Sequence, residues 1–577
     1  MRPAAALVPL AALVAAITGV ALFALSRPVP PPPDGRPKLV VLVVFDQMRG
    51  DYLERWRLLF GPNGFARLQR DGAWFTNCHY PYGTTTTGPG HASMLTGACA
   101  DSHGIVNNDW QENGNGVYCA GHPRYQLVPP APVFPPDPTE KVAEKKSAEK
   151  KVFGFPGHLL SETVADVLKE TSPRSKVFGL SLKDRSAILP TGRRPDGAYW
   201  FYGVFGTSDY YTERVHPWVA KFNASRAADR WFNVDWTKSC PDLDYTAWSG
   251  PDDVRGEGKG VGQGIAFPHP TTGGKRQLGP KYYEALANSP FGNDLLLAFA
   301  KSCIHAEKLG TRDAPDLLVV SFSSNDLIGH TWGPDSQEVM DVTLRSDAIM
   351  AELLSYLDER VGKGQYLLAV TADHGVCPLP EVSQSKGIAS AQRVDKDELQ
   401  KELDAHLTRL FPTTKPTDGK AAKWVEGFSF PWVYLNPRLV TASAQPREAI
   451  AAEAAKFLAT RSGVSRTFTR AELAGTIPES DAVATRMKRS FHPARCGDVC
   501  VILQPYCINS KRLDTGTTHG AAYHYDTHVP LLVYGPGIRG GTRDEPTTPQ
   551  AIASIFAKWL NVRRPKAAAF PIQETLD

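Results

Sequence analysis

Residues 38–46 read KLVVLVVFD, an unbroken apolar run between Lys38 and the carboxylate of Asp46. Such a run is typical of a strand that is buried on both faces, as in the middle of a parallel sheet. Two later stretches follow the same plan: DLLVVSF at 316–322 lies just before Asp326, and YLLAVT at 366–371 lies just before Asp373 and His374. The sequence therefore predicts parallel strands with polar residues just past their carboxyl ends.

The segment between the last two strands, residues 336–361, has helical periodicity. Ser336 or Asp335 is its expected N-cap, and Gly362 follows its end. A strand, a helix and a strand in this order imply a right-handed crossover. Residues 529–534 (VPLLVY) predict a further strand and 549–560 a closing helix. We therefore expect an α/β catalytic domain over 38–577, with a mostly parallel central sheet sandwiched by helices, and a site at the carboxyl edge of the sheet.

Two long stretches interrupt this pattern and are expected to be insertions that form caps over the sheet. One covers about 111–280 and is rich in Gly, Pro, Trp and Tyr. The other covers about 383–511 and includes a predicted amphipathic helix at 444–462.

The amino-terminal end predicts export. Residues 1–26 contain an apolar run after Arg2, and 27–37 form a proline-rich linker. The run is longer than the ~7–15 apolar residues of a usual signal peptide and close to the ~20 of a spanning helix. It is therefore either a secretory signal or a membrane anchor, with cleavage left open. The protein is expected to be periplasmic or secreted, or else anchored to the inner membrane.

The bulk composition limits the classes of binding partner that can be expected. The formal net charge is only +4, from 64 basic and 60 acidic residues, which gives no argument for specific nucleic-acid binding or for an anionic membrane as partner. A monomer is the favoured oligomeric state.

The chain has nine cysteines, an odd number, so in an exported protein at least one is expected to lack an intramolecular partner. Cys496, Cys500 and Cys507 lie close enough in sequence to suggest a thiolate zinc site. Their spacing is not one of the common zinc patterns, and an oxidising compartment favours disulfides, which we therefore expect.

Carboxylates and imidazoles recur after the predicted strands, and their oxygen and nitrogen atoms suit zinc. The pattern is one Asp after the first strand, Asp-x-x-x-His after the second, Asp-His after the third, and a late His: Asp46, Asp326, His330, Asp373, His374 and His519. Any one of these alone would more often be a cap or an ordinary polar residue. Together they divide into three ligands for each of two metals, which leaves open positions for substrate.

A tract of four threonines, 84–87, runs into Gly88-Pro89-Gly90-His91 and a helix of small residues. The first turn of a helix presents N–H groups to an anion. A threonine there is either an N-cap or, if a metal lowers the pKa of its hydroxyl, a nucleophile.

Seven stretches together carry a resemblance to a known family. They are VVFDQMRGDYL (43–53), the threonine tract with its Gly-His, HGIVNNDW (103–110), SLKDRSAILPTGRRPDGAYWF (181–201), DLIGHTWG (326–333), TADHG (371–375) and THGAAYHYDTHVPLLVYGPG (518–537). In this order they resemble the alkaline phosphatase superfamily, and most closely its bacterial single-threonine, phosphate-insensitive branch, which is related to the nucleotide pyrophosphatase/phosphodiesterases. The matching motifs span 38–536.

The resemblance implies roles for individual residues. Thr87 would be the covalent nucleophile and a metal ligand. One zinc would be held by Asp326, His330 and His519, and the other by Asp46, Asp373 and His374. His519 is preferred to His524 and His528 because the ligand lies in a His-Gly pair. Other divalent ions are not excluded.

Three further residues match the phosphoryl-binding set of the monoesterases: Asn108, Lys183 and Arg185. A monoester has two charged terminal oxygens, one more than a diester, and these amide and cationic groups can receive them. The expected function is therefore an alkaline phosphatase that hydrolyses small phosphate monoesters through a phosphothreonine at a two-zinc site. The alternative is a phosphodiesterase or nucleotide pyrophosphatase on the same fold. A non-catalytic metal- or phosphate-binding protein is a more distant possibility.

Overall fold

The computed structural model describes residues 36–112, 114–135, 153–412, 422–511 and 515–571. The predicted signal or anchor at 1–26 and nearly all of the linker at 27–37 lie outside these ranges. Among the described residues, no helix combines the length and the apolar character that crossing a membrane requires.

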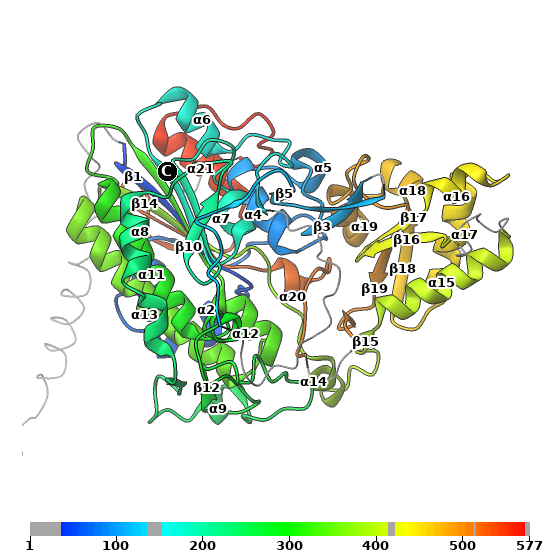
Figure 1. Ribbon diagram of the computed structural model, residues 1–577, viewed down its shortest axis with the longest axis horizontal. Helices are drawn as coiled ribbons and strands as arrows, with labels where there is room; N and C mark the ends of the chain where they lie inside the picture. Colours follow the sequence, from blue (N-terminus) through cyan, green and yellow to red (C-terminus); the bar gives the residue numbers. More distant parts are fainter. Residues whose placement is uncertain (1–35, 113, 136–152, 413–421, 512–514, 572–577) are drawn as a thin grey trace, which may run out of the picture.

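The centre of the fold is a sheet in which ten strands of the described chain take part (Figure 1). Their spatial order is β22 (Gly541–Arg543), β2 (Ala73–Phe75), β21 (Leu531–Tyr534), β14 (Tyr366–Thr371), β1 (Leu39–Phe45), β13 (Asp316–Phe322), β8 (Val177–Ser181), β9 (Gly197–Phe201), β10 (Phe205–Ser208) and β6 (Leu127–Val128). The five strands from β14 to β9 are parallel. The predicted fold class, a mostly parallel sheet between helices, is confirmed.

The three apolar runs form the middle of this sheet. Every residue of β1, β13 and β14 is buried, as expected of strands covered on both faces. In the register, Phe45 lies opposite Phe322, and Val44 lies opposite Thr371. The carboxyl ends therefore meet at one edge, and the residues after them are brought together.

Helices cover the sheet in two groups (Figure 1). The first contains α4 (Thr87–Thr96), α5 (Ala100–His103), α6 (Val164–Thr171), α7 (Asp184–Ile188) and α21 (Ala551–Leu560). The second contains α3 (Phe65–Asp71), α8 (Pro217–Ala224), α10 (Pro280–Ala287), α11 (Pro290–Glu307), α12 (Ser324–Trp332) and α13 (Gln337–Leu357).

Helix α13 is the predicted crossover helix, and Ser336 is its N-cap, because its side chain accepts a hydrogen bond from Val339 N. The α-helix ends at Leu357, earlier than predicted, because a π-helical turn takes over at 358–362. Helix α21 and strand β21 each begin two residues later than the sequence suggested.

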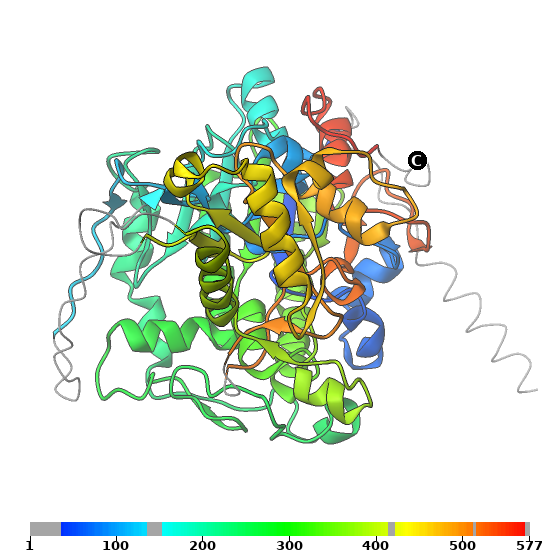
Figure 2. The ribbon, with the colours of Figure 1, turned by 90° about the vertical axis from the view of Figure 1, so that its right-hand side faces the viewer.

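A second, smaller sheet forms a cap beside the central one, at the right in Figure 1 and facing the viewer in Figure 2. We call it the cap sheet; its order is β16 (Val425–Ser429), β17 (Trp432–Leu435), β19 (Val499–Leu503) and β18 (Val464–Thr469). On one face it packs against α15 (Lys396–Leu410) and α17 (Arg447–Ala459). Helix α17 lies within the range 444–462 in which the sequence predicted a helix.

Alternate residues of β17 reach two different cores, as the pleat of a strand requires. Val433 belongs to the core of the cap, shared with α15 and α17. Trp432 packs in a separate cluster that includes Val106 and Trp110. The cap sheet is thus attached to the segment that follows α5. Of the other stretch, 111–280, four strands (β6, β8, β9 and β10) belong to the central sheet.

The cysteine prediction was wrong. All nine cysteines lie in the described part of the chain and all are free, eight of them buried and Cys240 exposed. Cys496 Sγ donates to Ser490 O, and Cys507 Sγ donates to Ser390 O. Burial raises the pKa of Cys496 to about 12, so the thiol stays neutral. These sulfur atoms are directed at backbone carbonyls rather than at one another, which supports neither a disulfide nor a thiolate metal site.

Candidate active site

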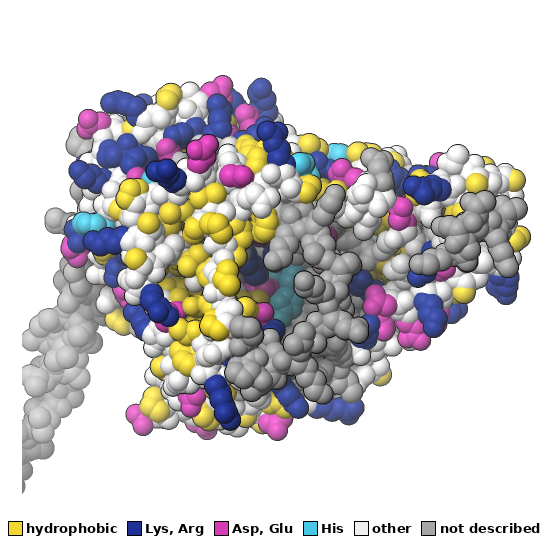
Figure 3. All heavy atoms as spheres, viewed as in Figure 1, with side chains coloured by type: hydrophobic (Ala, Val, Ile, Leu, Met, Phe, Trp, Pro, Cys, Tyr) yellow, Lys and Arg dark blue, Asp and Glu magenta, His cyan; other side chains and the backbone are white. Residues whose placement is uncertain are grey.

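The predicted ligands lie where the parallel strands end. Asp46 follows β1, Asp326 and His330 lie one turn apart on α12 after β13, and Asp373 and His374 follow β14. His519 comes from the loop before α20 (His524–Thr527). Figure 3 shows histidine side chains at the bottom of a hollow near the middle of the molecule.

Five of the six predicted ligand residues form two overlapping groups that could hold a metal ion. In one group, ligand atoms of Asp46, Asp373 and His374 lie within 4.8 Å of one another. In the other, those of Asp326, His374 and His519 do. His374 is therefore common to both. His330 lies beside the second group, with its Nε2 3.2 Å from Asp326 Oδ1.

Three histidines direct Nε2 toward the carboxylates of these groups, because Nδ1 of each is engaged by a backbone carbonyl. Nδ1 of His330 donates to Thr517 O at 2.8 Å, Nδ1 of His374 to Gly375 O at 3.0 Å, and Nδ1 of His519 to Thr85 O at 2.7 Å. A carbonyl can only accept, so Nδ1 carries the proton and the lone pair lies on Nε2. Metal-binding histidines are commonly oriented in this way.

The carboxylates also fit a cation. Asp46 Oδ1 and Asp373 Oδ2 are buried and have no hydrogen-bond partner in the described chain. Burial and the neighbouring Asp373 raise the pKa of Asp46 well above its usual range, because a desolvated carboxylate beside another is unstable without positive charge. Burial, with His374 and His330 nearby, lowers the pKa of His519, which keeps it in the neutral, ligating form. The donor set suits a divalent cation.

Thr87 is the first residue of α4, and Thr86 occupies the N-cap position. Thr87 is therefore not the N-cap of this helix, so the alternative role that the sequence left open for it is wrong. Its Oγ1 lies 3.5 Å from His374 Nε2. The helix approaches Asp373 so closely that a Cβ on Gly90 would lie 2.3 Å from Asp373 O. Glycine at 90 thus allows Thr87 to reach the metal-ligand groups.

The three predicted phosphoryl-binding residues come from other elements and contact Thr87, its neighbour Gly88 or the predicted ligands. Arg185 Nη2 lies 3.5 Å from Thr87 Oγ1, and Arg185 Nε is buried without a partner among the described residues. Asn108 Oδ1 accepts from Gly88 N at 2.7 Å, which directs its amide NH₂ elsewhere. Lys183 Nζ donates to Asp46 Oδ2 at 2.6 Å and to Asp326 Oδ2 at 2.5 Å. Lys183 thus balances the carboxylates of both groups.

Two buried residues of the site were missed. Gln47 donates from Nε2 to Asp326 Oδ1 at 2.6 Å and from its backbone N to Asp373 Oδ1 at 3.1 Å. Its backbone lies in the left-handed region, with a φ of 68°. It directly follows Asp46, which was the available signal. His91 lies one helical turn after Thr87; its Nδ1 is 3.0 Å from Thr87 O and 3.2 Å from Asp373 Oδ2. The Thr-x-x-x-His spacing could have indicated it.

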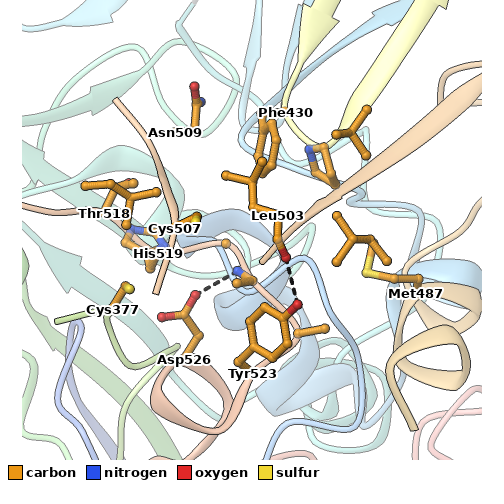
Figure 4. Close-up of a pocket in the computed structure, with 17 residues that line it drawn as sticks. Cys377, Phe430, Met487, Leu503, Cys507, Asn509, Thr518, His519, Tyr523 and Asp526 are labelled. Carbon is orange, nitrogen blue, oxygen red and sulfur yellow. Dashed lines mark hydrogen bonds between the residues drawn. The ribbon is translucent and has the colours of Figure 1, made fainter. Parts of the chain in front are cut away.

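A narrow cavity lies behind His519, between its loop and the cap sheet (Figure 4). Its walls include Phe430, Met487 and Leu503, and its accessible volume is only ≈ 30 Å³. That is room for about one or two water molecules rather than for a substrate. At its edge Asp526 Oδ2 accepts from Ala521 N at 2.7 Å, which fixes the loop that carries His519.

Asp526 predicts a pH dependence of stability. Burial raises its pKa to about 8, although N–H groups of Ala521 and Gly520 oppose the shift. The folded chain therefore keeps this proton up to about pH 8, whereas an unfolded chain loses it near pH 4. Between these values the folded state binds more protons, so the free energy of unfolding should fall as pH rises, by at most about 1.4 kcal/mol per unit.

Asp526→Asn keeps the acceptor for Ala521 N and removes the titration. Denaturant unfolding at about pH 5 and about pH 8 should show a smaller loss of stability for this variant than for the wild type. Equal losses in the two proteins would contradict the assignment of this proton to Asp526.

Several known proteins are similar to this chain over nearly its whole length. Residues 40–522 match the family described as type I phosphodiesterase / nucleotide pyrophosphatase. Alkaline phosphatase PafA of Elizabethkingia meningoseptica is 33% identical over 560 residues, covering 94% of this chain and 95% of that protein. Alkaline phosphatase PhoV of Synechococcus elongatus is 32% identical over 549 residues, covering 92% of each. The crystal structure of PafA superposes with a TM-score of 0.83 at 31% identity, over 94% of this chain and 99% of that one. The chain belongs to the type I phosphodiesterase / nucleotide pyrophosphatase family, within the alkaline phosphatase superfamily.

Proposed function

We propose that this protein is an alkaline phosphatase that hydrolyses phosphate monoesters, with Thr87 as the covalent nucleophile. The observation that carries the proposal is the convergence of Arg185 on the Thr87 hydroxyl, next to two carboxylate–histidine groups. The relatives PafA and PhoV, which match over nearly the whole chain, are named alkaline phosphatases.

The reaction would be a double displacement. Thr87 Oγ attacks phosphorus as its proton leaves to solvent; an Oγ–P bond forms, and the bond from phosphorus to the alcohol oxygen breaks with its electron pair. The alcohol oxygen takes up a proton from solvent as it leaves. Water then attacks the phosphothreonine from the side the alcohol left and loses a proton to solvent; the new O–P bond forms and the Oγ–P bond breaks with its electron pair on Thr87 Oγ. Inorganic phosphate is released and Thr87 takes a proton back from solvent. Arg185 and the amide of Asn108 would bind the non-bridging oxygens, whose charge is redistributed in each step.

The six predicted ligands would hold two zinc ions or other divalent cations, divided as the family resemblance implies. Asp46, Asp373 and His374 would form one site beside Thr87, and Asp326, His330 and His519 the other. When bound, such ions lower the pKa of a coordinated hydroxyl and stabilise negative charge on attacking and leaving oxygens. Lys183, which donates to Asp46 and Asp326 in the structure, would supply positive charge to the phosphoryl oxygens.

Export of the protein, as periplasmic, secreted or membrane-anchored, is part of the proposal and rests on residues 1–26 alone. Small monoesters are the proposed substrates, and a monomer is the proposed state.

The rival function is a diesterase or nucleotide pyrophosphatase, the activity that appears in the description of the family, whereas the relatives that match nearly the whole chain are named alkaline phosphatases. The experiment that separates the two compares rates on an aryl phosphate monoester and on the matching diester. The wild type should prefer the monoester. A preference for the diester would replace the proposed function by the rival one.

Lys183→Ala combined with Arg185→Ala should reduce monoester hydrolysis far more than diester hydrolysis, because only a monoester presents the extra charged oxygen. We expect about 10²–10³-fold loss on the monoester, the usual cost of removing electrostatic stabilisation. Arg174→Ala with Lys176→Ala removes the same charges from the opposite end of β8 and is the matched control. Equal losses on both substrates would argue against the proposed role of Lys183 and Arg185.

A further inference from the structure

Asn107 precedes the predicted phosphoryl-binding Asn108, and its side chain makes four hydrogen bonds. Its Oδ1 accepts from Thr86 Oγ1 at 3.0 Å and from Asn108 N at 2.8 Å. Its Nδ2 donates to Ser429 Oγ at 3.2 Å and to Phe430 O at 2.8 Å. The residue is only 7% exposed. A primary amide offers two donors and two acceptor positions, so the side chain of Asn107 makes all the hydrogen bonds that it can make.

The acceptor end of Asn107 belongs to a ring of contacts around Thr87. Thr86, on one side of Thr87, bonds to Asn107 through its hydroxyl. Gly88, on the other side, donates its backbone N–H to Asn108 Oδ1. Two consecutive asparagines thus hold the residues before and after the nucleophile. The same bonds set the distance between Thr87 and Asn108.

The donor end of Asn107 reaches the cap sheet. Ser429 is the last residue of β16, and Phe430 lies in the turn to β17; Phe430 also forms a wall of the cavity in Figure 4. The Ser429 hydroxyl in turn donates to Asp109 O. This hairpin therefore binds the residues on both sides of Asn108.

A second contact from the cap holds the other end of the threonine tract. Ser490, which follows α19 (Ala482–Arg489), accepts through Oγ from Gly83 N and Thr84 N, each at 2.9 Å. The threonine tract 84–87 is therefore held by the cap near both of its ends. Ser490 bonds directly to one end, and the hairpin at 429–430 reaches Thr86 through Asn107. The cap has its own hydrophobic core, so its fold does not depend on any one of these hydrogen bonds.

We propose that Asn107 is a positioning residue through which the cap hairpin 429–430 holds Thr87 and Asn108 in register for phosphoryl transfer. The inference rests on the proposed function. Asn107 acts through its neighbours and does not touch substrate. Small displacements of reacting groups are costly in rate, which is why such supporting contacts matter.

The test uses the full-length, metal-loaded protein and an aryl phosphate monoester. Asn107→Ala should lower kcat by about 10–100-fold, on the scale reported for displaced catalytic groups, with metal content unchanged. Ser429→Ala removes one of the two hairpin acceptors of Asn107 and leaves Phe430 O in place; it should show a smaller loss than Asn107→Ala. Asn436→Ala truncates an asparagine elsewhere in the cap, bonded to Lys423 O, and should retain wild-type kcat.

A double-mutant cycle with Asn108→Ala distinguishes positioning from general destabilisation. If Asn107 acts by placing Asn108, its replacement should cost clearly less in the Asn108→Ala background. The same fold loss in both backgrounds, or near-normal kcat for Asn107→Ala, would overturn the inference. If Asn107→Ala does not fold, Ser429→Ala carries the same cycle. A wild type without monoesterase activity would sink the proposed function instead, before any Asn107 variant is compared.

Discussion

Thr87→Ala is expected to reduce kcat on phosphate monoesters by about 10³-fold or more, the usual scale when a covalent nucleophile is removed. The variant lacks the only atom of this side chain that can form a bond to phosphorus. Any remaining turnover would come from direct attack by water in a site that still binds the phosphoryl group. Acid-quenched wild-type enzyme should carry one phosphoryl group by intact-mass measurement, and the variant none.

Two neighbouring substitutions make this result specific. Thr87→Ser keeps a hydroxyl at the same place and should retain part of the activity and the covalent intermediate. Thr84→Ala removes a buried hydroxyl of the same tract that has no hydrogen-bond partner within the described chain, and should stay close to the wild type. Turnover by Thr87→Ala within about tenfold of the wild type would remove Thr87 from the mechanism.

Removal of divalent metal is expected to abolish activity and to lower the melting temperature. Asp46, Asp326 and Asp373 are buried together, and Lys183 is the cation bonded to two of them. Without metal their mutual repulsion destabilises the fold, and metal binding to the folded state stabilises it by mass action. Chelation followed by titration with zinc should restore both properties, with about two ions bound per chain at saturation. Full activity of a metal-free protein would contradict the proposal.

Single histidine variants can then decide how the ligands are shared. His374 belongs to both ligand groups, whereas His519 belongs to one. If the groups act as they lie in the structure, His374→Ala should weaken binding at both sites and His519→Ala at one. If instead His330 completes the second site, as the family resemblance implies, His330→Ala should lose one ion and His374→Ala only one. Metal content and zinc titration after chelation measure this without relying on activity.

Much of the fold follows from local pattern. The three apolar runs are strands because only a position covered on both faces of a sheet makes such runs favourable. Parallel pairing then brings their carboxyl ends to one edge, so Asp46, Asp326 and Asp373 can be expected to meet there. Disulfides were predicted from compartment and composition, which contain no information about the direction of a thiol. Cys496 and Cys507 instead donate to backbone carbonyls.

Residues 38–46 and the two runs like them determined the central sheet and the edge at which a site forms, since burial and period act over a few neighbouring residues. The roles of Thr87, Asn108, Lys183 and Arg185 came from family resemblance. Only the tertiary structure decided that His374 is common to two ligand groups, that Lys183 joins Asp46 to Asp326, and that Asn107 connects the nucleophile to a cap hairpin. Most of these contacts join residues more than 100 positions apart, and no local periodicity encodes such contacts, because they depend on how separate elements pack.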